Sequence, residues 1–263
     1  MDRIRVATLN IWNRMGPWEE RLVAIREEVE RIQPDILGLQ EVLVLPEHGF
    51  DQAKAIAEGF GYHIAFGRAP DAASYGMGNA VLSRWPIART LVFGLPGTDE
   101  HRCLVLAEID APLGKVRCFS THLNWRFDQS DVRQLQVQCI ARFVRANAPL
   151  EDYPPIVVGD FNAEPDSDEI RFMRGLSALG DRSVHFADGF GVAGDGSPGV
   201  TFSKKNPYAA LLREPDRRID YVWVRGGDDR FRGEPLSARV CFDQPVGEAW
   251  PSDHFGVVAE LRV

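Results

Sequence analysis

The stretch "VVGDFNAEP", residues 157–165, places an acid and an amide directly after a short apolar run. Side chains two apart on an extended strand point to the same face, so Asp160 and Asn162 can face one spot together. Gly, Asp and Asn are also common turn formers, and a plain turn explains this stretch equally well. The rest of the sequence must therefore decide whether this stretch is a plain turn or part of a functional site.

The composition is that of a globular protein with a sizeable core, with 263 residues of which 44% are hydrophobic and 26% charged. A net charge of −8 and a pI near 5.3 argue against binding nucleic acid through bulk positive charge. An enzyme whose site meets phosphate through a bound cation is not excluded. No apolar run is long enough for a transmembrane segment, and the first residues lack the apolar stretch of a signal peptide. We therefore expect a cytoplasmic protein without an evident obligate protein partner, unless a leader was removed before residue 1.

The cysteines lie in apolar contexts and have no CxxC spacing, which argues against a zinc site and against a disulfide framework. We expect buried free thiols at Cys103, Cys118, Cys139 and Cys241.

Two strand–helix–strand units are predicted. In the first, the strands are residues 4–11 and 35–42, with Asn10 and Glu41 near their ends. The helix between them is favoured by Pro17 at its start and by apolar residues at helical spacing, which are Leu22, Ile25, Val29 and Ile32. In the second, a helix over 130–147 precedes a strand over 154–160, and its apolar face is expected to carry Val132, Leu135, Ile140 and Val144.

Short β-rich runs lie between the two units, and the pair joined by "APLGK" predicts a hairpin; these runs are residues 62–67, 78–84, 88–94, 103–110 and 115–122. A helix over 166–177 and a long loop over 188–217 are expected next, followed by strands over 217–225 and 254–263. No repeat or linker divides the chain, so residues 1–263 are predicted to form a single domain.

Polar side chains recur at the strand ends, where packed scaffolds often carry their chemistry. Each has a bland explanation when taken singly, such as a strand end in solvent or a capped turn. Together they offer carboxylates suited to Mg²⁺ or Mn²⁺, histidines for proton transfer, and amides that can hold phosphate oxygens. This inventory is the one that metal-assisted phosphoester hydrolysis requires, and it comprises Asn10, Glu41, His122, Asp160, Asn162, Asp220, Asp253 and His254.

Six motifs in order, "TLNIW", "LQEV", "STHLN", "GDFNAEP", "RIDYVWV" and "SDHFGVVAEL", resemble those of the endonuclease/exonuclease/phosphatase (DNase I-like) superfamily. The resemblance extends from residue 8 to about residue 260. Any one motif is weak, but six in order are specific. The resemblance implies an α+β fold, a four-layered αββα sandwich of two mostly antiparallel sheets packed face to face with helices outside.

The resemblance also implies roles for these residues. Glu41 is expected to bind the metal ion, Mg²⁺ or Mn²⁺, with Asn10 and Asp253 beside it. Asp160 is expected to position or deprotonate the attacking water, and Asn162 to contact the phosphate.

On the other side of the phosphate, His254 is expected to act as a hydrogen-bond donor or acid/base, oriented by Asp220, with His122 across from it. Arg102 falls where the superfamily often has a phosphate-contacting arginine, although a solvated strand start explains it equally well. Abasic-site endonucleases carry an acid two residues after the first Asn. Trp12 occupies that place here, which argues against a second metal ligand there and against that activity.

The substrate-binding residues are expected in the charged segment 201–213, with Lys204, Asn206 and Tyr208 as candidates beside Arg102. The alternative for this segment is a solvated loop. Stacking on bases is one expectation for Trp12, Trp125 and Trp250, and buried packing is the other.

The function expected from these residues is a metal-dependent phosphoric ester hydrolase. Its most favoured form is a phosphodiesterase acting on a nucleic acid or a phospholipid headgroup. The alternatives are a phosphomonoesterase acting on a sugar or inositol phosphate, and a binding module that keeps the fold without catalysis.

Overall fold

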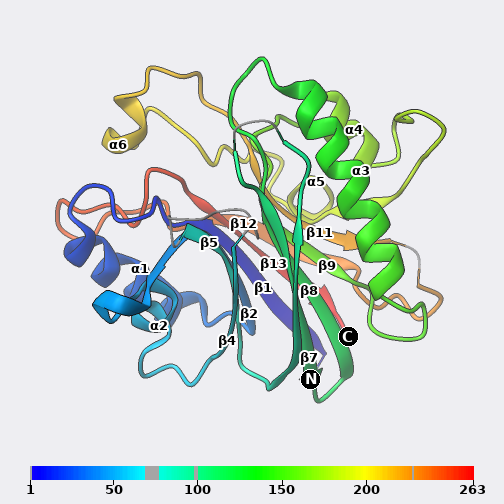
Figure 1. The fold of residues 1–263 in the computed structure, drawn as a ribbon, viewed down its shortest axis with the longest axis horizontal. Coiled ribbons are helices and arrows are strands. Elements are labelled where there is room, and N and C mark those ends of the chain that lie inside the picture. Colours follow the sequence, from blue (N-terminus) through cyan, green and yellow to red (C-terminus); the bar gives the residue numbers. More distant parts are fainter. Residues whose placement is uncertain (1, 69–76, 98–99, 227) are drawn as a thin grey trace.

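The computed structural model describes residues 2–68, 77–97, 100–226 and 228–263, and its strands form two sheets (Figure 1). The first sheet has seven strands in the order β12-β13-β1-β2-β5-β4, with β3 paired to β2. β1 and β2 run parallel, and the other pairs are antiparallel. Its strands are β1 (Arg3–Asn10), β2 (Ile36–Leu45), β3 (Phe50–Asp51), β4 (His63–Gly67), β5 (Met77–Ser83), β12 (Pro235–Cys241) and β13 (Gly256–Arg262).

The second sheet has six strands in the order β10-β11-β9-β8-β7-β6. β8 and β9 are its parallel pair, so each sheet contains one strand–helix–strand unit of the kind predicted from the sequence. The "APLGK" hairpin joins β7 to β8 as expected. The strands are β6 (Ile87–Gly94), β7 (Cys103–Ala111), β8 (Gly114–His122), β9 (Ile156–Asp160), β10 (Phe186–Asp188) and β11 (Asp220–Arg225).

Helices cover the outer faces of both sheets. α1 (Trp18–Ile32) and α2 (Gln52–Ala57) lie on one side, and α3 (Ser130–Asn147) and α4 (Asp168–Met173) on the other (Figure 1). The shorter helices are η1 (Pro46–His48), α5 (Gly189–Ala193) and α6 (Pro207–Ala210). Among the described helices, none is long and apolar enough to cross a membrane.

Three apolar layers separate these four layers of secondary structure. One cluster, including Val6, Val158 and Val222, lies between the sheets. A second packs α1 against the first sheet, and a third packs α3 and α4 against the second. Because side chains alternate along each strand, each sheet contributes apolar side chains to the layer on either of its faces. The predicted αββα sandwich is therefore confirmed.

Gly159 shows why the stretch 157–165 folds as it does. Its φ is +149°, and a Cβ there would lie 2.0 Å from the carbonyl oxygen of Thr121 on β8. Only glycine allows this close approach of the two backbones. The approach brings the end of β9, with Asp160, directly beside the end of β8.

Some details differ from the sequence-based expectations. Val132 is only half-buried and Leu135 is exposed, because the buried face of α3 is formed by Arg133, Gln136, Val137, Ile140, Ala141 and Val144. The predicted helix over 166–177 is shortened to α4. The expected loop over 188–217 contains α5 and α6. All cysteines are free, but Cys139 is half-buried.

Candidate active site

Strand register places a row of polar side chains at the rim of the second sheet. His122 ends β8 and pairs in register with Asp160, which ends β9. Asp220, the first residue of β11, pairs with Asp160 from the other side. Three residues far apart in the sequence are thus neighbours, with Asp160 in the middle.

The rim of the first sheet contributes Asn10 and Glu41. The register of β2 shifts between Leu39 and Val42, and Glu41 has a φ of +58°. Such a bulge re-aims a side chain, and a left-handed backbone at a residue other than glycine is costly. Asn10 Nδ2 donates to Glu41 Oε1 (3.2 Å) and to Asp160 Oδ2 (3.0 Å), so it bridges the two sheets.

The segment before β13 places Asp253 and His254 between the two rims. The Ser252 hydroxyl lies 2.6 Å from the carbonyl oxygen of Asn10 and accepts a hydrogen bond from the His254 backbone N–H (3.3 Å). Thr201 Oγ1 accepts from the backbone N–H of Asp220 (3.1 Å), and its carbonyl oxygen accepts from that of Phe255 (2.6 Å). Ser252 and Thr201 therefore hold the segments that carry Asp220, Asp253 and His254 in place.

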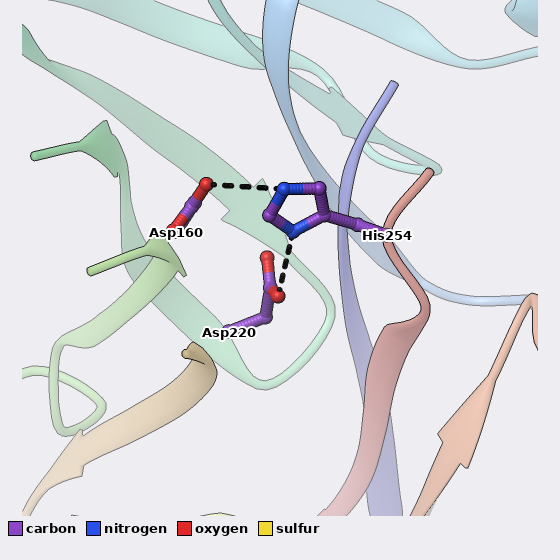
Figure 2. Close-up of side chains that lie close together, drawn as sticks. All are labelled: Asp160, Asp220 and His254. Carbon is purple, nitrogen blue, oxygen red and sulfur yellow. Dashed lines mark hydrogen bonds and ion pairs between the residues drawn. The ribbon is translucent and has the colours of Figure 1, made fainter. Parts of the chain in front are cut away.

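His254 lies between two buried carboxylates (Figure 2). Its Nδ1 is 3.0 Å from Asp220 Oδ2, and its Nε2 is 3.7 Å from Asp160 Oδ2. Burial alone would lower the pKa of His254, but the charges of Asp220, Asp160 and Asp253 raise it well above its usual value. The surrounding carboxylates therefore favour the imidazolium form of His254, whose charge would compensate theirs.

His122 has the opposite character. Burial, together with the positive charges of Arg102 and His254, lowers the pKa of His122 well below its usual value, so its imidazole is neutral. Its Nε2 lies 3.3 Å from Asp160 Oδ2 and 3.1 Å from Asn162 Nδ2. The pKa of Asp160 is raised by its burial and by the charge of Asp220. Such opposed shifts within one cluster are typical of acid–base machinery.

The carboxylates of Glu41 and Asp253 form a separate pair. Burial, with the nearby charge of Glu41, raises the pKa of Asp253 to about 7. Crowded carboxylates are electrostatically unfavourable without a cation, and hard oxygen donors suit Mg²⁺. This donor set fits a divalent ion. Asn10 fits less well as a ligand, because its Oδ1 accepts from the Trp12 backbone N–H (3.0 Å).

A second group of potential ligands is the cluster of Asp160, Asp220 and His254, which brings one ligand atom from each within 4.8 Å of the others. Asp220 Oδ1 is buried and has no hydrogen-bond partner within the described residues. His254 Nδ1, however, already faces Asp220. In this cluster Asp220 is hydrogen-bonded to His254 (3.0 Å), and Asp160 lies within ion-pair distance of His254 (3.7 Å).

These side chains surround a cavity of about 300 Å³. The expected site residues that line it are Asn10, Glu41, Arg102, His122, Asp160, Asn162, Asp253 and His254. Asp220 does not line the cavity but contacts His254 Nδ1 on the side away from it. Trp12 and Trp125 also line the cavity, whereas Trp250 packs against Phe255 with ring centroids 5.7 Å apart.

The expected substrate-binding segment 201–213 borders the cavity through Phe202 and Leu212, but its three named candidates do not line it. Lys204 is exposed and does not line the cavity. Asn206 is fully buried, because its Nδ2 donates to the Ser252 carbonyl oxygen (2.7 Å) and its Oδ1 caps α6. Tyr208 stacks on Trp12 with ring centroids 4.9 Å apart. These contacts place Asn206 and Tyr208 behind the cavity wall, and their expected role in substrate binding stays a prediction.

Besides Phe202, other residues of this region reach the cavity that were not predicted from the sequence. Leu212, Glu214 and Arg217 line it, and the Arg217 guanidinium forms an ion pair with Glu214. Arg217 also lies 4.5 Å from the ring centroid of Phe127. The sequence of residues 211–217, "LLREPDR", contains no signal for which side chains turn inward.

Comparisons with known proteins agree with this geometry. A family model described as "Endonuclease/Exonuclease/phosphatase family" matches residues 7–254. Nocturnin of Xenopus laevis is 26% identical over 264 residues, which cover 93% of this chain and 64% of that protein. A putative neutral sphingomyelinase of Drosophila melanogaster is 26% identical over 294 residues, which cover 99% of this chain and 61% of that protein. The chain thus spans less than two thirds of the length of these relatives.

Among solved structures, TDP2 of D. rerio complexed with a single strand DNA product superposes with a TM-score of 0.77. The similarity covers 99% of each chain at 17% sequence identity, and it shows a shared fold. The family model spans most of the chain, and the residues it matches include every side chain placed around the cavity above. The chain belongs to the endonuclease/exonuclease/phosphatase family.

Proposed function

We propose that this protein is a divalent-metal-dependent phosphodiesterase that hydrolyses a nucleic acid or phospholipid-headgroup phosphodiester by water attack. The observation that carries the proposal is the buried Asp160 carboxylate between His254 and His122, on the wall of a cavity that the carboxylates of Glu41 and Asp253 also line. The names of the relatives support both substrate classes, since one is a sphingomyelinase and one structural neighbour contains DNA.

Glu41 and Asp253 are the residues that would hold Mg²⁺ or Mn²⁺, as the fit of their carboxylates suggests. When bound, such an ion would supply positive charge against the negative charge that develops on the phosphate in the transition state. Asn10 keeps Glu41 and Asp160 at a fixed separation through its amide nitrogen.

Asp160 is the proposed acceptor for the proton of the attacking water. Its Oδ1 accepts from the Asn162 backbone N–H (2.9 Å), and its Oδ2 faces the two histidines. The raised pKa of this buried carboxyl, caused by its burial and by Asp220, makes it a stronger base than an exposed aspartate.

His254 is the proposed donor to the phosphate. With its Nδ1 facing Asp220, the imidazolium presents Nε2–H toward the cavity, where it can donate to a phosphate or leaving-group oxygen. Asn162 and Arg102 line the same cavity, and their N–H groups are suited to the other phosphate oxygens.

Hydrolysis of bis-p-nitrophenyl phosphate tests the proposal. Purified enzyme with Mg²⁺ should turn over this diester, and EDTA should abolish the turnover reversibly. Asp160→Asn should lower kcat by roughly 10²–10⁴, the usual contribution of a positioned acid or base. Asp181→Asn is the matched control, because that side chain is exposed and lies outside the cavity.

The alternatives give different results in the same assay. Turnover of p-nitrophenyl phosphate but not of the diester would indicate a phosphomonoesterase. No turnover of either ester would indicate a binding module. Full activity in excess EDTA would contradict the proposed metal requirement.

A further inference from the structure

Large apolar side chains remain exposed around the mouth of the catalytic cavity. Met15, Trp125 and Leu212 line the cavity and are 58%, 50% and 58% exposed. Phe127, which lies over Arg217, is 56% exposed, and Leu211 is 76% exposed. We name these five residues the apolar rim. They come from three loops far apart in sequence, and an apolar patch gathered at a site marks an interaction surface.

The rim is poorly suited to stacking on nucleobases. A base needs an open ring face. Trp12, in the wall beside the rim, already stacks on Tyr208 and lies 5.1 Å from the Arg21 guanidinium. Phe127 carries the Arg217 guanidinium on its ring. Three of the five rim residues are aliphatic and offer no ring at all. These side chains are instead of the kind that inserts into an apolar medium.

The charges at the cavity also disfavour a polyanion. Within the described residues, Arg102 and Arg217 are the lysine or arginine side chains that line it, and both are neutralised by carboxylates, Glu100 at 2.5 Å and Glu214 respectively. The affinity of a polynucleotide comes largely from cations that displace its counterions. A zwitterionic lipid surface needs no such cations, because each phosphate is balanced by its own headgroup. The net charge of −8 would oppose contact with an anionic surface.

We propose that the apolar rim docks the mouth of the cavity on a zwitterionic lipid surface. The inference rests on the proposed function, because such a surface presents headgroup phosphodiesters of the class assigned above as substrate. Trp, Phe, Leu and Met side chains at a cavity mouth insert favourably at the boundary between headgroups and acyl chains.

Vesicle flotation tests the docking surface without turnover. Wild-type protein in EDTA should bind phosphatidylcholine vesicles. The double variant Leu211→Ala/Leu212→Ala should bind about tenfold more weakly or less, because partitioning scales with the apolar area that is buried. Leu150→Ala/Leu176→Ala is the matched control, since it makes the same chemical change at exposed leucines outside the cavity. It should bind as wild type does, and melting curves should show all three proteins folded.

Absence of wild-type binding to phosphatidylcholine, or equal binding by the two double variants, would overturn the proposal. So would binding that requires phosphatidylserine. A fluorescent single-stranded oligonucleotide provides the remaining arm. If the rim variant loses affinity for it while no protein binds vesicles, the rim is a nucleic-acid contact instead. Hydrolysis of bis-p-nitrophenyl phosphate in lipid-free solution reports the proposed function separately, so active enzyme that ignores vesicles would reject only the docking surface.

Discussion

At Asp160 the two oxygens of one carboxylate have different neighbours. Oδ1 accepts from the backbone N–H of Asn162, which is a local turn of the kind that Asp favours. Oδ2 faces Asn10 and both histidines. The turn and the site are therefore the same structure: the hydrogen bond to Asn162, whose φ is +51°, holds the carboxylate with its second oxygen toward the cavity.

Asp220 illustrates a residue that acts through another. It contacts His254 Nδ1 but does not line the cavity. We expect His254→Ala to lower kcat by roughly 10²–10⁴ and Asp220→Asn to lower it less, because only the orienting charge is lost. In the His254→Ala background, Asp220→Asn should cost little more, since the two residues work as a unit. The measurement is kcat for the four proteins of the double-mutant cycle.

Stability must be followed in the same cycle, because His254→Ala leaves buried carboxylates without their imidazolium. Thermal melts of all four proteins separate that effect from catalysis. Losses in kcat that simply multiply across the cycle would mean that Asp220 touches the reacting groups directly.

At the scale of elements, α1 fastens the loop that carries Trp12. The Arg21 side chain is fully buried and donates to five carbonyl oxygens, those of Ile11 (2.7 Å), Trp12 (3.4 Å), Asn13 (2.8 Å), Met15 (3.0 Å) and Pro251 (3.0 Å). Burial lowers the pKa of Arg21 to about 10, although Asp253 and Glu41 act against this. One helix residue thus holds the backbone on two sides of the cavity.

We expect Arg21→Lys to destabilise the protein by about 2 kcal/mol or more, because an ammonium cannot replace the fork of donors and leaves buried carbonyls unsatisfied. Urea unfolding measures this loss, and hydrogen exchange should be faster over residues 11–15. Arg26→Lys on the same helix is the control, since Arg26 is half-buried and, among the described residues, donates to the carbonyl oxygens of Ala55 and Ile56 alone. Equal losses for both variants would contradict the special role of Arg21.

The elements were largely predictable because each strand and long helix carries its own period of apolar residues, as β1 and α1 do. The face of α3 was mispredicted because Arg133 and Gln136 are buried by polar contacts, Arg133 with Glu169 at 2.6 Å and Gln136 with Asn124 at 2.7 Å. The spacing of apolar residues cannot predict a helix face that is buried through polar side chains.

The same reasoning explains what was predictable of the site. The positions of the cavity-lining acids and histidines were found because they end strands in recognisable motifs. Thr201, Ser252 and Arg21 were missed in their positioning roles, because each acts through backbone groups up to 242 residues away in the sequence. Within the segment 201–213, the sequence could not show which side chains turn toward the cavity: Lys204 is exposed, whereas Phe202 and Leu212 line the cavity.

At the scale of the whole molecule, net charge and local charge make different predictions. The net charge of −8 is spread over the surface, where salt screens it within about 10 Å at 0.1 M ionic strength. The two arginines that line the cavity, Arg102 and Arg217, are each paired with a carboxylate. If pairing rather than net charge controls anion binding, then freeing one cavity arginine from its carboxylate should raise the affinity for a polyanion. Removing a negative charge elsewhere on the molecule should raise that affinity far less.

Glu214→Gln and Glu234→Gln compare these two effects directly, since each removes one negative charge and releases one arginine. Glu214 pairs with Arg217 in the cavity wall, whereas Glu234 pairs with Arg262 outside the cavity (2.7 Å). We expect Glu214→Gln to bind a single-stranded oligonucleotide more tightly than wild type, with a salt slope steeper by about one counterion. Glu234→Gln should change neither quantity. Fluorescence anisotropy in EDTA over a range of KCl concentrations measures both. Equal gains in the two variants would show that the field of the whole molecule, and not the Glu214–Arg217 pair, keeps polyanions out of the cavity.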